Sequence, residues 1–156
     1  MRILKINGKN LASLAGEFGV DFEQEPLAST GLFAISGPTG AGKSTLLDAL
    51  CLALYDATPR LLKVAGRSYL ADVGAETVST QDPRTLLRRG TAEGHAEVDF
   101  VGSDGASYRA RWSVRRSRTK AEGALQPTQM TLHLLPALQA IGGTKTEGVP
   151  CGCDSW

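Results

Sequence analysis

The sequence lacks the features of secreted and membrane proteins. Cysteine occurs only at Cys51, Cys151 and Cys153, too few and too unevenly spaced for a disulfide framework. The last two have too few potential ligands nearby to form a metal site. No apolar stretch approaches the roughly 20 residues that a membrane-spanning helix requires, and the N-terminus alternates polar and apolar residues, unlike a signal peptide. We therefore expect a soluble, cytoplasmic protein with no membrane partner.

An excess of charge of one sign is also missing. The 156 residues include 17 Lys and Arg against 16 Asp and Glu, which gives a formal net charge of +1. The whole-chain charge therefore neither favours nor excludes a polyanionic partner, and such a partner must be argued from local clusters. The length suits one domain with a core of its own.

Alternating apolar and polar residues predict two antiparallel strand pairs and one further strand. The first pair consists of residues 2–6 and 17–22, and residues 7–16 between them form a loop or an irregular second half of the first strand. The second pair consists of residues 96–100 and 108–114, joined by a glycine-containing turn. Residues 130–134 form the further strand.

A short apolar run predicts a strand of a different kind. Residues 32–36 are continuously apolar up to a final serine, as in a strand buried on both faces in the middle of a parallel sheet. A helix is predicted from about residue 43 to 55, and its small polar face places it between layers, with Cys51 in the core. Residues 56–59 end this helix, and residues 60–85 show no clear period, which indicates a long surface excursion.

The segment between this strand and helix has the P-loop pattern, Gly37-Pro38-Thr39-Gly40-Ala41-Gly42-Lys43-Ser44. Its glycines let backbone N–H groups converge on a phosphate that side chains would obstruct. The helix start adds unpaired N–H groups and its positive dipole end. Lys43 would reach the β- and γ-phosphates, and the Ser44 hydroxyl can bind Mg²⁺. The sequence therefore predicts binding of ATP, or a close relative, with magnesium.

The residues needed for hydrolysis are not recognisable. A P-loop ATPase also needs an acidic residue after a second apolar strand. No run of four apolar residues ending in Asp or Glu follows residue 60, and Asp99 lies in an alternating, half-exposed pattern. The catalytic residues stay unassigned, and we expect no ATP hydrolysis by this chain alone.

A basic stretch ends the second strand pair, with Arg109, Arg111, Arg115, Arg116, Arg118 and Lys120. Glu97 and Asp99 on the neighbouring strand are expected to pair with the first two arginines. Arg115, Arg116 and Arg118 have no such partners in the hairpin and are candidates for contacts with DNA phosphates. A second basic cluster, with the same two interpretations, consists of Arg84, Arg88 and Arg89.

The chain resembles the SbcC family of bacterial nuclease subunits over roughly residues 1–147. The likeness is carried by residues 11–14, 31–55, 58–61, 86–93 and 96–100. It implies an SMC-like DNA-repair ATPase: an ABC-type head made from both ends of a long chain, with a coiled coil and a zinc hook between them. Two heads would enclose two ATP molecules, and an SbcD-like nuclease partner would cut double-stranded DNA ends and hairpins at the nucleoid.

The resemblance also implies a fold and particular site residues. The fold would be an α/β P-loop NTPase, the N-terminal lobe of an ABC-type head, with an antiparallel β-subdomain beside the P-loop strand and helix. Residues 37–45, including Thr45, would hold the phosphates and Ser44 the magnesium. Ser13 would lie near the nucleotide, and Arg89 would belong to a segment approaching its base.

The end of the sequence departs from the family. Residues 148–156 no longer resemble it, so we expect one lobe over residues 1–147 and an aberrant or truncated tail. Three other functions stay open: a small-molecule P-loop kinase, an ABC transporter ATPase, and an inactive remnant.

Overall fold

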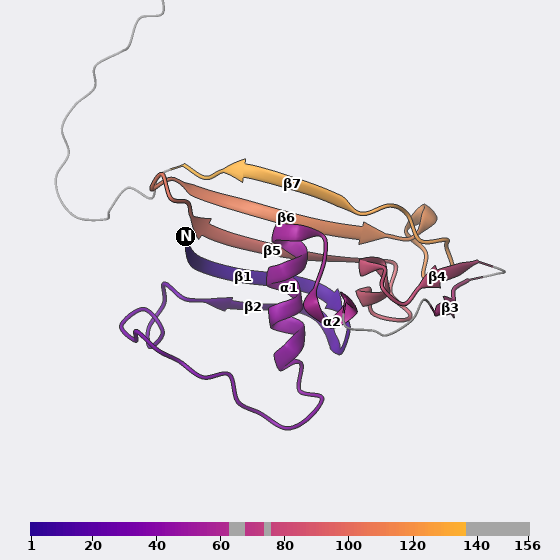
Figure 1. Ribbon diagram of the computed structural model, residues 1–156, viewed down its shortest axis with the longest axis horizontal. Coiled ribbons are helices and arrows are strands. Elements are labelled where there is room, and N and C mark those ends of the chain that lie inside the picture. Colours follow the sequence, from indigo (N-terminus) through magenta and orange to yellow (C-terminus); the bar gives the residue numbers. More distant parts are fainter. Residues whose placement is uncertain (63–67, 74–75, 137–156) are drawn as a thin grey trace, which may run out of the picture.

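A five-stranded antiparallel sheet forms the body of the computed structural model, which describes residues 1–62, 68–73 and 76–136. Figure 1 shows its strands in the order β2-β1-β5-β6-β7. Their bounds are β1 Arg2–Leu11, β2 Leu14–Asp21, β5 Glu93–Val101, β6 Ser107–Arg115 and β7 Gln129–Leu134. Both predicted strand pairs and the further strand are therefore confirmed, and β1 extends beyond its predicted end at residue 6 to residue 11.

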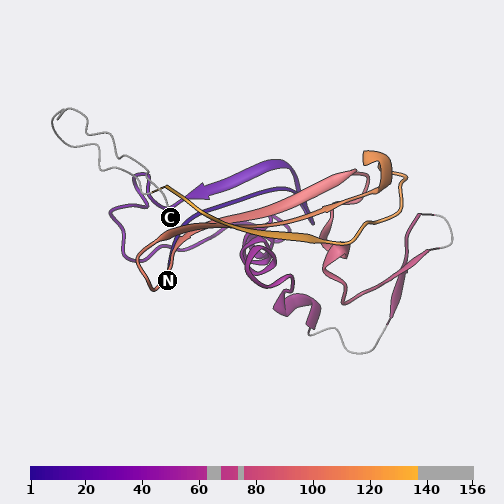
Figure 2. The same cartoon turned by 90° about the horizontal axis from the view of Figure 1, so that it is seen from above.

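Helix α1 (Lys43–Tyr55) crosses one face of this sheet and supplies most of the core. Ala49, Leu52 and Ala53 are buried against apolar side chains of β1, β5 and β6, among them the fully buried Trp112. Figure 2 shows α1 and the short α2 (Pro59–Leu62) on the same side of the sheet. Burial of this apolar stripe is what holds the helix to the sheet.

The prediction that α1 lies between two layers is wrong for the described residues. Leu47 on its outer side is 57% exposed, and Tyr55 is exposed as well. Cys51 is half-buried rather than in the core, and burial raises the pKa of its thiol. A single sheet covers only one side of a helix, so the apolar outer side has no partner among these residues.

The predicted strand at residues 32–36 is also wrong. This segment has no strand structure, and Leu32 is 91% exposed. In Figure 1 it belongs to the long loop that leaves β2 and returns to α1, and Phe33 stacks on Phe22 at a ring-centroid distance of 5.0 Å. A buried parallel strand needs neighbours on both sides, and each described strand already pairs antiparallel within its own sheet.

The described parts of residues 60–85 lie outside the main sheet, as predicted, and carry small elements of their own. These are α2, the hairpin of β3 (Tyr69–Ala71) with β4 (Thr77–Ser79), and the 3₁₀ turn η1 (Pro83–Leu86). A second 3₁₀ turn, η2 (Ser117–Thr119), follows β6. Within the described part of the chain no helix is long and apolar enough to cross a membrane. The predicted tail at residues 148–156 and the boundary at residue 147 lie outside the described residues.

Candidate nucleotide-binding site

The glycine-rich loop has the backbone conformation that its sequence requires. Gly40 and Gly42 have φ angles of 84° and 92°, in the left-handed region that side chains disfavour. A Cβ atom on Gly42 would also clash with the side chain of Leu14. Residues 37–41 are exposed, so the loop is open to a ligand from outside.

The start of α1 suits an anion. Gly42 is the N-cap and provides no side-chain cap, and the first turn holds no acidic residue. The Gly42 carbonyl accepts from the amides of Thr45 and Leu46 at 2.9 and 3.2 Å. An uncapped helix start presents N–H groups and a positive dipole end, which together favour a phosphate.

Lys43 places its charge over this loop. Its Nζ donates to the carbonyl oxygens of Gly37 at 2.6 Å and Pro38 at 2.8 Å. The ammonium group is thereby held beside the backbone that would surround a phosphate, and the exposed Ser44 follows it on the first turn. These residues fit a nucleotide phosphate chain, with Ser44 as the hydroxyl available to a magnesium ion.

The turn between β1 and β2 packs against the same helix start. Ser13 Oγ lies 3.3 Å from Thr45 Oγ1, and Thr45 is buried. Leu14 lies over Gly42, so closely that its side chain occupies the space a Cβ atom there would need. Ser13 is therefore brought next to the P-loop.

Arg89 lies beside the β3–β4 hairpin. Its side chain is exposed and lines a cavity of about 310 Å³ with Leu70 and Val73 of the β3–β4 hairpin region. The lining of that cavity contains no residue of the P-loop. Sequence reasoning missed the role of the neighbouring Arg88, whose side chain does reach the β1–β2 turn and donates to the carbonyls of Ala12 and Ser13. No local pattern signals a contact between segments so far apart.

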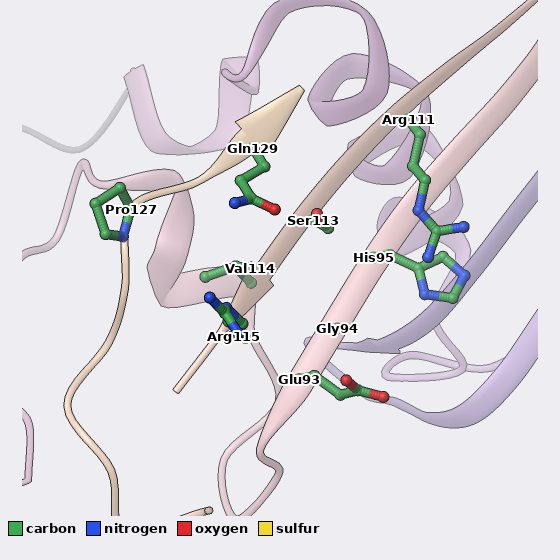
Figure 3. Close-up of a pocket in the computed structure, with 9 residues that line it drawn as sticks. All are labelled: Glu93, Gly94, His95, Arg111, Ser113, Val114, Arg115, Pro127 and Gln129. Carbon is green, nitrogen blue, oxygen red and sulfur yellow. The ribbon is translucent and has the colours of Figure 1, made fainter. Parts of the chain in front are cut away.

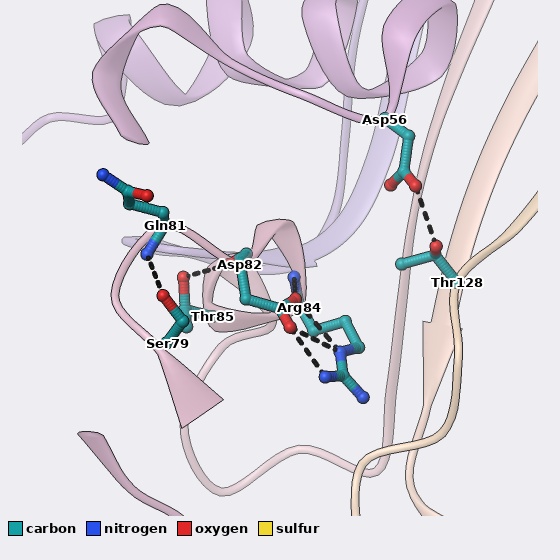
Figure 4. Close-up of polar contacts among 7 residues, drawn as sticks. All are labelled: Asp56, Ser79, Gln81, Asp82, Arg84, Thr85 and Thr128. Atoms are coloured by element: carbon teal, nitrogen blue, oxygen red, sulfur yellow. Dashed lines mark hydrogen bonds and ion pairs between the residues drawn. The ribbon is translucent and has the colours of Figure 1, made fainter. Parts of the chain in front are cut away.

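The far end of α1 is fixed to the sheet by one carboxylate. Asp56, the C-cap, accepts from Trp112 Nε1 at 2.6 Å and from Thr128 Oγ1 at 3.0 Å. Figure 4 shows the second of these contacts. Nearby, Asp82 caps η1 and pairs with Arg84. Burial would raise the pKa of Asp82, but its hydrogen bonds with Arg84 lower it.

Acidic groups suited to hydrolysis are not gathered at the loop in the described part of the chain. Asp48 in α1 is buried, but it accepts from Thr58 Oγ1 at 2.6 Å and from Arg60. Asp99 accepts from Arg109 through both oxygens, each at 2.7 Å. Among residues 1–62, 68–73 and 76–136 no cluster of three His, Cys, Asp or Glu could hold a metal ion.

The expected ion pairs across β5 and β6 are confirmed. Arg109 pairs with Asp99, and Arg111 donates to Glu97 at 3.0 Å. Figure 3 shows Arg111 beside His95 at a cavity of about 180 Å³ that Arg115 also lines. Burial, and then the charge of Arg111, lower the pKa of His95. Cross-strand pairing therefore largely neutralises the charges of Arg109 and Arg111.

Arg116 has a partner outside the hairpin, which cross-strand pairing did not predict. Its guanidinium donates to both carboxylate oxygens of Asp72, at 2.8 and 3.1 Å, and to the Gly123 carbonyl at 2.9 Å. Asp72 follows β3, so cross-strand pairing within the β5–β6 hairpin could not reveal it. Arg115 and Arg118 are exposed.

The site combines a helix start without a side-chain cap, two glycines with a left-handed backbone, and a lysine whose Nζ is bound to carbonyls of the loop. This combination defines a P-loop nucleotide-binding protein. The chain belongs to the AAA domain family, which it matches over residues 5–135. It is 60% identical over 145 residues to the SbcC subunit of nuclease SbcCD from Pseudomonas aeruginosa, covering 93% of this chain and 12% of that protein. The protein of the same name from Rhodobacter capsulatus is 54% identical over 132 residues, covering 85% and 11%.

The matched region of these relatives is the N-terminal ATPase region of SbcC, a subunit of the SbcCD nuclease. A more distant relative, from Deinococcus radiodurans, is 36% identical over 92 residues, or 59% of this chain and 9% of the relative. The chain thus spans about an eighth or less of the length of these curated relatives.

Proposed function

We propose that this chain is the ATP-binding N-terminal lobe of an SbcC-like ABC-type head. Residues 37–45 hold the phosphates of ATP, and Ser44 provides a ligand to Mg²⁺. Ser13 lines the same site. The observation that carries the proposal is the uncapped start of α1 with Lys43 Nζ held 2.6 Å from the Gly37 carbonyl, which concentrates positive charge beside free backbone N–H groups.

Exposed apolar side chains support the idea that the lobe is one part of a larger head. On the outer side of α1 and in the preceding loop these are Leu32, Ile35 and Leu47. On β7 they are Met130, Leu132 and Leu134. Patches of this kind mark surfaces that other parts of an assembly cover. In the complete protein those parts are the second half of the head and a second ATPase head.

The complete protein is proposed to work in DNA repair as part of a nuclease, the class that its relatives' name states. An SbcD-like nuclease subunit would be its partner and double-stranded DNA its substrate. Arg115 and Arg118 are exposed cations of the basic stretch and are the candidates for phosphate contacts. Arg116 is a weaker candidate because its guanidinium is already engaged by Asp72.

Nucleotide binding by Lys43→Ala tests the proposal. Binding of a fluorescent ATP analogue to the unmodified chain should need Mg²⁺ for full affinity and weaken when EDTA is added. Lys43→Ala should weaken it roughly 10- to 100-fold, because charge-assisted contacts to the phosphates are lost.

Lys120→Ala is the matched control, an exposed lysine outside the loop, and should bind like the unmodified chain. Equal affinity of the Lys43→Ala and Lys120→Ala variants would overturn the proposed site. ATP turnover by the isolated chain above background would overturn the expectation that its catalytic residues lie elsewhere.

A further inference from the structure

Arg88 connects two segments that are far apart in the sequence. Its Nη1 donates to the carbonyl oxygens of Ala12 at 3.0 Å and Ser13 at 2.9 Å, across 76 and 75 residues of chain. Its own backbone amide donates to the Asn10 carbonyl at 2.9 Å. One residue therefore satisfies three carbonyl acceptors, that of residue 10 near the end of β1 and those of residues 12 and 13 in the β1–β2 turn.

The turn that Arg88 binds is conformationally unfavourable. Ala12 has a φ angle of 45°, in the left-handed region that residues other than glycine, asparagine and aspartate seldom occupy, and the nearby Asn10, which tolerates this region, has a φ angle of 53°. Such residues persist where surrounding contacts fix them, and they occur often at functional sites. Here the Ala12 amide also donates to the Leu86 carbonyl at 2.8 Å. The segment 86–88 therefore accepts a hydrogen bond from the turn, at the Leu86 carbonyl, and also donates hydrogen bonds to the turn, from Arg88.

The same turn contacts the start of the P-loop helix. Ser13 Oγ lies 3.3 Å from Thr45 Oγ1, and Thr45 directly follows Ser44. Leu14 packs over Gly42, whose carbonyl accepts the first hydrogen bonds of α1. A shift of the turn would therefore move Ser13 and uncover the residue at which the helix begins.

We propose that Arg88 is a positioning residue of the nucleotide site. Its guanidinium fixes the strained β1–β2 turn, and the turn, through Ser13 and Leu14, fixes the N-terminal end of α1 against which the phosphates of the nucleotide bind. Arg88 acts through backbone carbonyls and makes no contact with the nucleotide itself. This inference rests on the proposed nucleotide-binding function, since a positioning role requires a site to position.

The first test is nucleotide affinity. Arg88→Met removes the donors and keeps most of the aliphatic stem, and should weaken Mg²⁺–ATP binding about tenfold, the effect of losing charged hydrogen bonds. Arg88→Lys keeps a charged donor on a similar stem and should recover most of the loss. Arg84→Met is the matched control, because Arg84 lies on the same segment but pairs with Asp82; it should leave affinity within about twofold.

A double variant separates positioning from general stability. If Arg88 acts through Ser13, the effect of Ser13→Ala on affinity should be much smaller in the Arg88→Met background than alone. Simple addition of the two effects would contradict the inference. So would an Arg88→Met variant that binds nucleotide as well as Arg84→Met does.

Hydrogen exchange of the nucleotide-free chain tests the inference without a measurement of nucleotide binding. In Arg88→Met the amides of Ala12, Thr45 and Leu46 should exchange faster, while those in the middle of β5 and β6 keep their protection. Unchanged exchange at these three amides overturns the inference. If the unmodified chain binds no nucleotide, the proposed function fails and the positioning role with it. If it binds and only Lys43→Ala weakens binding, the positioning role alone fails.

Discussion

Arg111 on β6 and Arg116, directly after that strand, both form ion pairs but contribute differently to the molecule. The side chain of Arg116 is only 12% exposed and its Asp72 partner 10%, and the guanidinium spans both carboxylate oxygens. The hydrogen bond from Arg116 lowers the pKa of Asp72 against the opposing effect of burial. Arg111 is 42% exposed, so solvent screens its pair with Glu97. Burial therefore decides how much each ion pair contributes to the stability of the fold.

At this scale we predict that Arg116→Met destabilises the fold by about 3 kcal/mol, because Asp72 would keep a buried charge without a partner. Arg111→Met should cost under about 1 kcal/mol. Urea unfolding at neutral pH measures both. The double variant Arg116→Met with Asp72→Asn should be more stable than Arg116→Met alone.

The lowered pKa of Asp72 also predicts how the stability of the unmodified chain depends on pH. A carboxyl group whose pKa is lowered on folding contributes stability above its unfolded pKa, and this stability is lost as the pH falls through the folded value. The unmodified chain should therefore lose this contribution only in strongly acidic solution, below the ordinary value of 3.8. Equal stability of the two single variants at all pH values would contradict the argument.

At the scale of secondary-structure elements, α1 is fixed at both of its ends. At its start Ser13 and Leu14 contact Thr45 and Gly42. At its end Asp56 holds the indole of Trp112 on β6 and the hydroxyl of Thr128, one residue before β7. The helix that carries the P-loop is thus joined through single side chains to both edges of the sheet and to its interior.

Asp56 has a left-handed backbone with a φ angle of 51°, so its replacement has two consequences. We predict that Asp56→Ala costs about 3 kcal/mol, from the unpaired buried indole N–H and from backbone strain at alanine. Asp56→Asn should cost under about 1 kcal/mol, since asparagine accepts hydrogen bonds and tolerates this conformation. Thermal unfolding followed by circular dichroism compares the two. Similar losses in both variants would show that the hydrogen bonds are not what matters.

At the scale of the whole molecule, the sheet is covered only in part. Met130, Leu132 and Leu134 pair with Trp112, Ala110 and Tyr108, so they lie on the face that carries α1. They are nevertheless exposed, Leu132 by 62% and Leu134 by 67%. An apolar strip on an edge strand favours association with other surfaces.

We predict that Leu132→Glu combined with Leu134→Glu lowers self-association of the isolated chain in sedimentation velocity, with little change in its unfolding midpoint. Both side chains are already exposed, so their replacement removes little buried area. Thr131→Glu, on the opposite face of the same strand, is the control and should leave self-association unchanged. A loss of folding in the double variant would contradict the exposure of this strip.

Local patterns alone determined much of this protein. Alternation predicted the strand pairs at residues 2–22 and 96–114, because a strand with one buried face repeats every two residues. The glycines and Lys43 predicted a phosphate site, because their conformation and charge are properties of adjacent residues. The apolar run at residues 32–36 misled the prediction, since a buried strand needs partners that the described chain does not supply.

Only the tertiary structure decided which distant side chains meet. It paired Arg116 with Asp72, 44 residues away, and brought Arg88 to the turn beside the P-loop. It also left one side of α1 uncovered among the described residues. Side-chain pairing across such separations follows from the packing of whole elements, and no local period of the sequence encodes it.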